Sequence, residues 1–304
     1  MADGWASLGD SLSRVRARAQ RVDRGCWSGP DARRCWDELD RIASELGSLA
    51  VTIDLAARRL LAQAMQQRRA SEADVAVRTL EHSHGGDGRW VGWVGPEDAT
   101  VVVVLVPGVG TDEGDRASLE LDAGRVREHL QLVGERRLSG ESVAVVAWLG
   151  YDPPDNILSG VRRGPAAEGA ARLALDVDRW RVAGARRVVA VGHSYGALVV
   201  ARAAADGMTA DEVVLLGAPG LGAGGAGFDR DGGGPGLWSA SAAADPIALL
   251  ARVGIIHGED PSARARPLPT SADGHGAYLE DPVLLDALAR LALGDGAGGT
   301  VAAG

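Results

Sequence analysis

The chain has 304 residues, enough for one large domain with a full core, or for such a domain with an appendage. All 32 residues counted as lysine or arginine are arginines, and the formal net charge at pH 7 is −9. Residues 1–70 are slightly basic, whereas residues 71–304 carry 20 arginines against 32 acidic residues. Because an acidic surface repels phosphate backbones, we expect no nucleic-acid partner.

The sequence also argues against a membrane protein. The most apolar run, residues 101–110, is far shorter than the ~20 residues that a membrane-spanning helix needs. The first ten residues have neither the basic region nor the apolar region of a cleavable signal peptide. We therefore expect no membrane span and a cytoplasmic location.

Residues 1–72 are predicted to form an N-terminal α-helical hairpin. From Asp31 to about Arg69, apolar residues recur three or four positions apart, which places them on one side of a long helix. A shorter helix with a less regular pattern precedes it, and residues 25–31, with Pro30 as a helix-start signal, form the turn. A protein partner or a second copy of the chain is expected to dock on this hairpin.

The bend of the hairpin carries Trp27, Ser28 and Gly29. These residues resemble the Trp-X-Gly turn of the small helical-hairpin proteins that are exported by type VII secretion. The resemblance covers residues 1–70 only, and it implies export without a cleavable signal as the alternative to a cytoplasmic location. The tyrosine signal that usually follows the second helix in those proteins is missing between residues 70 and 90.

Cys26 and Cys35 are the only cysteines, and both lie in the hairpin. A disulfide framework is therefore excluded. One local bridge and a pair of unbridged thiols both stay open.

After residue 72 the pattern changes to short strands that alternate with helices. Residues 73–83 and 89–95 predict a β-hairpin across a glycine-rich turn. Continuous apolar runs of the kind buried on both faces of a sheet follow at 100–106, 142–150, 187–192, 212–217 and 237–243. Helical patterns lie near 115–134, 166–183, 195–206 and 281–293. This order predicts an α/β-hydrolase fold over residues 73–294, with a mostly parallel sheet, helices on both faces and an antiparallel hairpin at its start, followed by a flexible tail at 295–304.

Gly192-His193-Ser194-Tyr195-Gly196 lies where a buried strand ends and a helix begins. A nucleophile elbow occupies this position, because a sharp turn there exposes the serine hydroxyl at the carboxyl edge of the sheet. The two glycines let the backbone turn tightly, and Ser194 is expected in a strained conformation in front of the helix N-terminus. The alternative is a serine that only occupies a tight turn or caps the helix.

A serine hydroxyl needs a base and an orienting acid, in the chain order serine, acid, histidine. His275 lies in a glycine-flanked loop ahead of the last amphipathic helix and is the expected base, whereas His257 ends a short apolar run and is interpreted as structural. Asp245 follows the apolar run at 237–243 and precedes a proline, so it is the expected acid, with Asp260 as the reserve. An aspartate before proline is otherwise an ordinary helix cap.

Acyl transfer also needs hydrogen-bond donors for the oxyanion. The backbone N–H of Tyr195, the residue after the serine, is one expected donor. The other should come from the loop that follows the strand at 100–106, where Gly108 and Gly110 allow close approach of the backbone. Val109 or Gly110 is the expected second donor.

Seven motifs occur in order along the chain: VPGVGT (106–111), WLGYDPP (148–154), GHSYG (192–196), GAPG (217–220), Asp245-Pro246, IHGED (256–260) and GHGAYL (274–279). Together they resemble an α/β-hydrolase family of high-GC Gram-positive bacteria that is catalogued chiefly as a domain of unknown function. The resemblance spans about residues 74–294. It implies Ser194, Asp245 and His275 as the catalytic triad, with Tyr151 and Pro153 shaping the mouth of the pocket. One departure is Gly276, where this family often has a serine.

Two alternative interpretations of the sequence concern a dinucleotide and a metal ion. Gly108-x-Gly110 follows a strand, as in a dinucleotide fingerprint, but the third glycine, Gly114, comes one place late. His82 and His84 share one face of a strand, but neither a cysteine nor a cluster of carboxylates completes a metal site. We therefore expect neither a metal nor an organic cofactor.

The residues together predict a serine hydrolase that acts on the ester or thioester of a small-molecule acyl substrate. An acyltransferase would use the same triad. A second alternative is a catalytically idle α/β-hydrolase scaffold whose N-terminal hairpin binds a partner, because a fold does not guarantee its chemistry.

Overall fold

The computed structural model describes residues 77–83, 88–137, 140–154, 164–222, 234–252 and 258–294, together with Gly29, Asp31 and some residues between Arg33 and Ile42. Contacts divide the chain into two units, Met1–Asp74 and Val75–Gly304. In the first unit, the residues that are described from Asp31 to Ile42 are helical and exposed. Arg41 donates a hydrogen bond of 3.1 Å to Glu38, one turn earlier.

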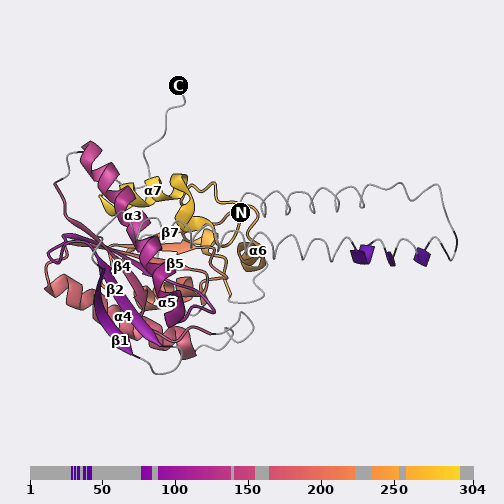
Figure 1. Ribbon diagram of the computed structural model, residues 1–304, viewed down its shortest axis with the longest axis horizontal. Coiled ribbons are helices and arrows are strands. Elements are labelled where there is room, and N and C mark those ends of the chain that lie inside the picture. The colour runs from indigo at the N-terminus through magenta and orange to yellow at the C-terminus, as the bar shows by residue number, and fades with distance from the viewer. Residues whose placement is uncertain are drawn as a thin grey trace. The chain divides into compact units, whose positions relative to one another are not determined.

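The second unit is built on one eight-stranded sheet with the order β1-β2-β4-β3-β5-β6-β7-β8 (Figure 1). The first three strands of that order pair antiparallel, and all neighbours from β4 to β8 are parallel. The strands are β1 (Val77–Ser83), β2 (Arg89–Val94), β3 (Val101–Val106), β4 (Val143–Leu149), β5 (Arg187–His193), β6 (Glu212–Leu216), β7 (Gly236–Ala240) and β8 (Arg266–Pro267).

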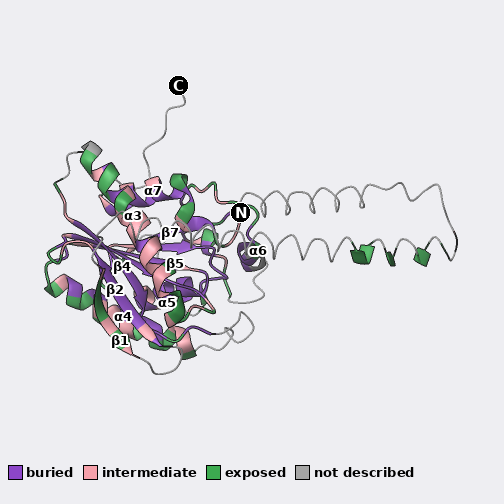
Figure 2. Cartoon of the chain, viewed as in Figure 1, coloured by how far each residue is buried: buried purple, intermediate pink, exposed green. Residues whose placement is uncertain are grey.

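Helices cover both faces of this sheet, which explains why its central strands are apolar throughout. Every residue of β3 and β4 is buried, as parallel strands between two helical layers require. The helices are α3 (Arg116–Arg137), α4 (Gly164–Val182), α5 (Tyr195–Ala205), α6 (Pro246–Arg252) and α7 (Pro282–Ala292). Residues of α4 and α5 belong to the core on one face, and residues of α3 and α7 belong to the core on the other (Figure 2).

The predicted fold class is confirmed. The predicted strands and helices of this unit recur at their places in the chain, and the hairpin of β1 and β2 joins the sheet antiparallel through β4. The strand β8 was not predicted, because two exposed residues, one of them a proline, carry no hydrophobic pattern. None of the described helices combines the length and the apolar character needed to cross a membrane.

Several sequence predictions concern residues outside the described part of the chain and stay predictions. They are most of the hairpin of residues 1–72 with its Trp27-Ser28 bend, Cys26 and Cys35, His84, His257 and the tail at 295–304.

Candidate active site

Ser194 ends the turn between β5 and α5 in a strained conformation. Its φ of 54° and ψ of −122° make it the only non-glycine residue with a positive φ in the described part of the chain. Such a backbone costs on the order of 1–3 kcal/mol and persists where the surroundings impose it. Here the Ser194 N–H donates a hydrogen bond of 2.9 Å to the carbonyl of Leu216, which fastens the turn to the end of β6. The N-terminus of α5 begins at the next residue and favours negative charge beside the serine.

The glycines of the turn are explained by the space around them. A Cβ atom at Gly196 would lie 2.2 Å from the carbonyl oxygen of Val106 and 2.5 Å from that of Pro107. A Cβ atom at Gly192 would lie 2.5 Å from the carbonyl oxygen of Gly196. The neighbouring atoms at these contacts belong to the backbone, which cannot move aside as the end of a flexible side chain could. The lack of a side chain at Gly196 therefore lets the turn pack against the end of β3, and its lack at Gly192 lets the strand pack against the first turn of α5.

Asp245 and His275, which are thirty residues apart in the chain, form a hydrogen-bonded pair. The Nδ1 atom of His275 lies 3.0 Å from Oδ1 and 2.9 Å from Oδ2 of Asp245. The aspartate side chain is fully buried, whereas 26% of the histidine side chain is exposed. Burial raises the pKa of Asp245, but hydrogen bonds from His275 and Tyr278 outweigh burial and hold the pKa below its ordinary value. The carboxylate therefore stays ionised and can orient the imidazole.

Asp245 also caps a helix, as the alternative interpretation of its place before a proline expects. Its Oδ1 accepts hydrogen bonds from the N–H groups of Ile247 and Ala248 in the first turn of α6. Asp260, the reserve candidate, instead accepts a hydrogen bond from the N–H of Ser262 and caps the short helix η4 (Pro261–Ala263).

Tyr278 is a site residue that sequence reasoning missed, although it belongs to one of the quoted motifs. Its hydroxyl donates a hydrogen bond of 2.6 Å to Oδ2 of Asp245 and accepts one of 2.8 Å from the N–H of Ala242. Burial, and then the hydrogen bond to the carboxylate, raise the pKa of Tyr278. The phenol therefore stays protonated and remains a donor to the aspartate.

Gly217, at the end of β6, lies between the serine turn and the aspartate–histidine pair. A Cβ atom there would lie 2.6 Å from Oδ2 of Asp245 and 3.0 Å from Nδ1 of His275. The preceding carbonyl is the one that accepts the hydrogen bond from Ser194. Within the described residues no hydrogen bond joins the serine hydroxyl to the imidazole. In enzymes, hydrogen bonds between a catalytic base and a nucleophile often tighten only in the complex with substrate.

The side chain of His193, which precedes Ser194 in the turn, contacts the loop that carries His275. Its Nε2 atom lies 2.7 Å from the backbone carbonyl of His275, and the two rings are 4.7 Å apart between centroids. Burial lowers the pKa of His193 to about 4, and the neighbouring His275 acts in the same direction. Because a carbonyl can only accept, the neutral His193 carries its proton on Nε2 and donates it to this bond. The sequence placed His193 in the elbow without indicating this contact.

The loop after β3 lies against the serine. A Cβ atom at Gly108 would lie 2.7 Å from Cβ and 3.2 Å from Oγ of Ser194, so only glycine fits there. The N–H of Gly110 donates to the carbonyl of Pro154 at 2.9 Å. Gly110 is therefore not available as an oxyanion donor, and Val109 stays as the candidate from this loop.

The expectation that Tyr151 and Pro153 shape the mouth of the pocket is wrong, because both residues are buried. The hydroxyl of Tyr151 donates a hydrogen bond of 2.8 Å to the carbonyl of Pro107. Its ring stacks between Trp148 and Tyr195, with centroid separations of 6.0 Å and 6.4 Å. Tyr151 thus fixes the loop after β3 from the buried core.

His82 contacts Glu113 through its Nε2 atom, in the loop between β3 and α3. No group of three or more potential metal ligands occurs among the residues that the structure describes. Glu113 is thus one partner of His82 on the hairpin of β1 and β2.

Known proteins match parts of this chain. The uncharacterized protein Rv2079 of Mycobacterium tuberculosis is 34% identical over 184 residues, which cover 56% of this chain and 26% of that protein. The uncharacterized protein Mb0988c of Mycobacterium bovis is 39% identical over 84 residues, which cover 26% of this chain and 31% of that protein. The matches therefore span about a quarter to a third of the length of these relatives.

Among solved structures, the carboxylesterase EstE1 from a metagenomic library is 18% identical, with a TM-score of 0.47, over 78% of this chain and 96% of that one. Dienelactone hydrolase from Anabaena variabilis is also 18% identical, with a TM-score of 0.43, over 72% of this chain and 95% of that one. More than half of the chain, residues 86–255, matches the family described as alpha/beta hydrolase. The chain belongs to the alpha/beta hydrolase family.

Proposed function

We propose that the protein is a serine hydrolase that cleaves an ester or thioester of a small-molecule acyl substrate through a covalent intermediate on Ser194. One observation carries this proposal. The buried carboxylate of Asp245 holds Nδ1 of His275 at 2.9 Å, next to the strained turn that carries the serine. Nucleophilic catalysis by a serine needs such an arrangement. The strained backbone of Ser194, a buried ionised carboxylate and a partly exposed imidazole lie at one edge of the sheet.

In the first half of the reaction, Oγ of Ser194 attacks the carbonyl carbon while Nε2 of His275 takes the hydroxyl proton. The tetrahedral intermediate collapses, the bond to the leaving oxygen or sulfur breaks, and the imidazolium returns the proton to that atom. In the second half, a water molecule gives a proton to Nε2 and attacks the acyl-enzyme. As this second intermediate collapses, the bond between the acyl carbon and Oγ breaks and the imidazolium returns its proton to Oγ, which releases the carboxylic acid and restores the serine hydroxyl.

The negative charge of each intermediate needs donors that are in place before the reaction. We assign this role to the backbone N–H groups of Tyr195 and Val109. Tyr195 is the first residue of α5, so the helix dipole acts in the same direction as its N–H group. Val109 follows the glycine whose backbone lies against the serine.

A fluorophosphonate probe tests the proposal, because it forms a covalent bond with an activated serine hydroxyl. We expect labelling of the folded protein at Ser194, identified by peptide mass spectrometry, and none in Ser194→Ala. Turnover of p-nitrophenyl esters should fall roughly 10³-fold or more in Ser194→Ala. Folded protein that takes no label would contradict the proposal and favour an idle scaffold.

The acid is tested by a matched pair of variants. Asp245→Asn should keep the fold but lower kcat by roughly 10³-fold or more, because the amide no longer fixes the imidazole tautomer. Asp260→Asn changes a carboxylate that contacts a local N–H group, and it should retain wild-type turnover. The reverse pattern would show that the acid is misassigned.

A further inference from the structure

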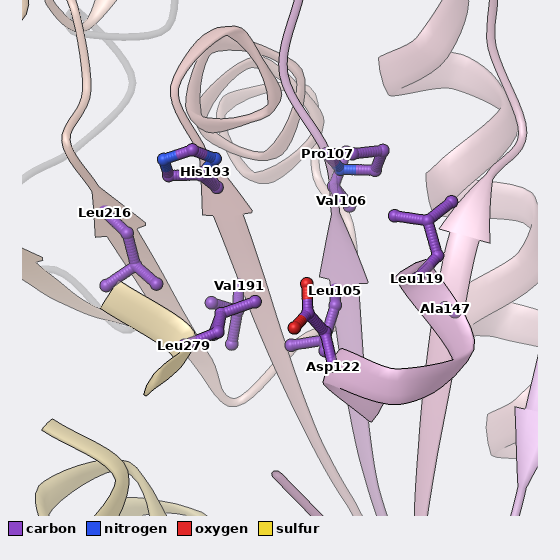
Figure 3. Close-up of a pocket in the computed structure, with 10 residues that line it drawn as sticks. All are labelled: Leu105, Val106, Pro107, Leu119, Asp122, Ala147, Val191, His193, Leu216 and Leu279. Atoms are coloured by element: carbon purple, nitrogen blue, oxygen red, sulfur yellow. The ribbon is translucent and has the colours of Figure 1, made fainter. Parts of the chain in front are cut away.

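A cavity of about 60 Å³ lies beside the elbow, on the face of the sheet that α3 covers (Figure 3). Its floor is apolar. Leu105, Val191 and Leu216 form it at the carboxyl ends of β3, β5 and β6, and all three are buried. These are the central parallel strands, and the serine turn continues directly from one of them. The cavity is therefore positioned by the same strands as the candidate active site.

Two residues that line the cavity are neighbours in the chain of residues at the serine turn. They are Pro107 and His193. The next residues along the chain are Gly108 and Ser194, whose backbones lie against each other; a Cβ atom on the glycine would be 3.2 Å from the serine Oγ. Pro107 and His193 are therefore each one position from a residue at the serine, which places the cavity next to the candidate nucleophile.

The outer rim is formed by partly exposed residues of two elements. Leu119 and Asp122 come from α3, and Leu279 comes from the short helix η5 (Tyr278–Glu280). Asp122 is the one acidic lining residue, and its carboxylate is turned toward the floor strands in Figure 3. Arg125 donates a hydrogen bond of 2.9 Å to Oδ1 of Asp122.

We propose that this cavity is the acyl subsite and that it selects short acyl chains without a terminal negative charge. The proposal rests on the proposed function of Ser194. The volume accommodates a few water-sized groups, which corresponds to the roughly three to five carbons beyond the carbonyl in chains from butyryl to hexanoyl. The apolar floor favours hydrocarbon. The carboxylate at the rim repels a chain that ends in a second carboxylate, because like charges at short range in a partly desolvated site are costly.

The charge of the rim depends on pH. Burial raises the pKa of Asp122 to about 6, with Arg125 opposing this effect and Glu280 adding to it. His193, the other titratable lining residue, is neutral above its pKa of about 4. Asp122 is therefore ionised at pH 8 and mostly protonated at pH 5, so the repulsion of acidic chains should weaken as the pH falls.

The first experiment measures chain-length selectivity. We expect kcat/KM for p-nitrophenyl esters to peak at butyrate or hexanoate and to fall for acetate and decanoate. Leu119→Phe should fill the cavity and lower the hexanoate-to-acetate ratio of kcat/KM by about tenfold. Leu132→Phe is the matched control, since Leu132 is an exposed residue of the same helix, about 20 Å farther along, and should keep the wild-type profile.

The second experiment measures charge selectivity with two esters of equal length, ethyl levulinate and monoethyl succinate, whose hydrolysis a pH-stat records. The wild type should prefer the neutral levulinate at pH 8, and the preference should shrink at pH 5. Asp122→Asn should lower the preference at pH 8 by about tenfold and remove its pH dependence.

The outcomes separate the two proposals. An unchanged chain-length profile in Leu119→Phe, together with an unchanged charge preference in Asp122→Asn, would overturn the subsite while the fluorophosphonate label on Ser194 leaves the proposed function standing. Absence of the label in folded wild-type protein would overturn both.

Discussion

The hydroxyl of Tyr278 lies 2.6 Å from Oδ2 of Asp245, the same carboxylate oxygen that lies 2.9 Å from Nδ1 of His275. The tyrosine and the histidine are three residues apart on one loop, so this loop contacts the aspartate twice. A second donor to the carboxylate stabilises its ionised form and limits the directions in which it can accept a bond from the imidazole. We interpret Tyr278 as a positioning residue for the proposed triad.

Replacing Tyr278 by phenylalanine tests this role. Tyr278→Phe removes one donor from Asp245 and leaves the N–H of Ala242 without its acceptor. We expect kcat to fall about tenfold with little change in KM, and the free energy of unfolding to fall by about 1–3 kcal/mol. Steady-state kinetics and urea unfolding measure the two effects. A loss of stability with unchanged kcat would mean that the phenol only supports the fold.

His193 gives a second test, because its ring holds the backbone of the proposed base. His193→Gln keeps an N–H donor near the carbonyl of His275, whereas His193→Leu keeps similar bulk without a donor. The leucine variant should lose about tenfold or more in kcat, and the glutamine variant should recover most of that loss. Equal activity of the two variants would contradict a role for this hydrogen bond.

The same residue predicts a dependence of stability on pH. The pKa of His193 is about 4 in the folded protein and near 6.5 for an ordinary histidine. As the pH falls below 6.5 the unfolded chain takes up a proton that the folded protein does not, so stability is lost between about pH 6.5 and pH 4. Urea unfolding should show this loss in the wild type and a smaller loss in His193→Gln. Parallel curves for the two proteins would contradict the assignment.

The sequence predicted the parts of the site that depend on local pattern. A change from strand to helix located Ser194, and the order of strands located Asp245 and His275 at the same sheet edge. It missed Tyr278 and the contact of His193, because neither hydrophobic period nor spacing tells which groups of two distant loops meet. Tyr151 was misplaced for a related reason. An aromatic residue near a loop fits a pocket mouth and a buried support equally well until its burial is known.

Gly217 provides a test of the space between the serine turn and the aspartate–histidine pair. Its φ is +54°, and a Cβ atom would lie 2.6 Å from Asp245 Oδ2 and 3.0 Å from His275 Nδ1. Gly217→Ala should therefore lower kcat by about 10²-fold, since small displacements of catalytic groups are costly. Gly207→Ala is the matched control: its φ is +100°, so the backbone is strained as well, but nothing lies near its Cβ position. The control should lose stability and keep its activity.

Asp281 anchors the far end of the loop that carries His275. Its buried carboxylate accepts hydrogen bonds from the hydroxyls of Thr270 and Ser271, and from the N–H of Val283 at the start of α7. Burial raises the pKa of Asp281, but the hydrogen bonds from Ser271 and Thr270 outweigh it and hold the pKa below its ordinary value. The ionised carboxylate therefore stabilises the fold.

Asp281→Asn replaces one accepting oxygen with a donor, so we expect a loss of about 1–3 kcal/mol in the free energy of unfolding at pH 7. A carboxyl whose pKa is lowered by folding contributes stability above the pKa of the unfolded chain, about 3.9, and loses it as the pH falls through the folded pKa. The difference between wild type and variant should therefore shrink from pH 7 to pH 3 in urea unfolding. A difference that stays constant over this range would mean that the charge of Asp281 contributes nothing to the stability of the loop.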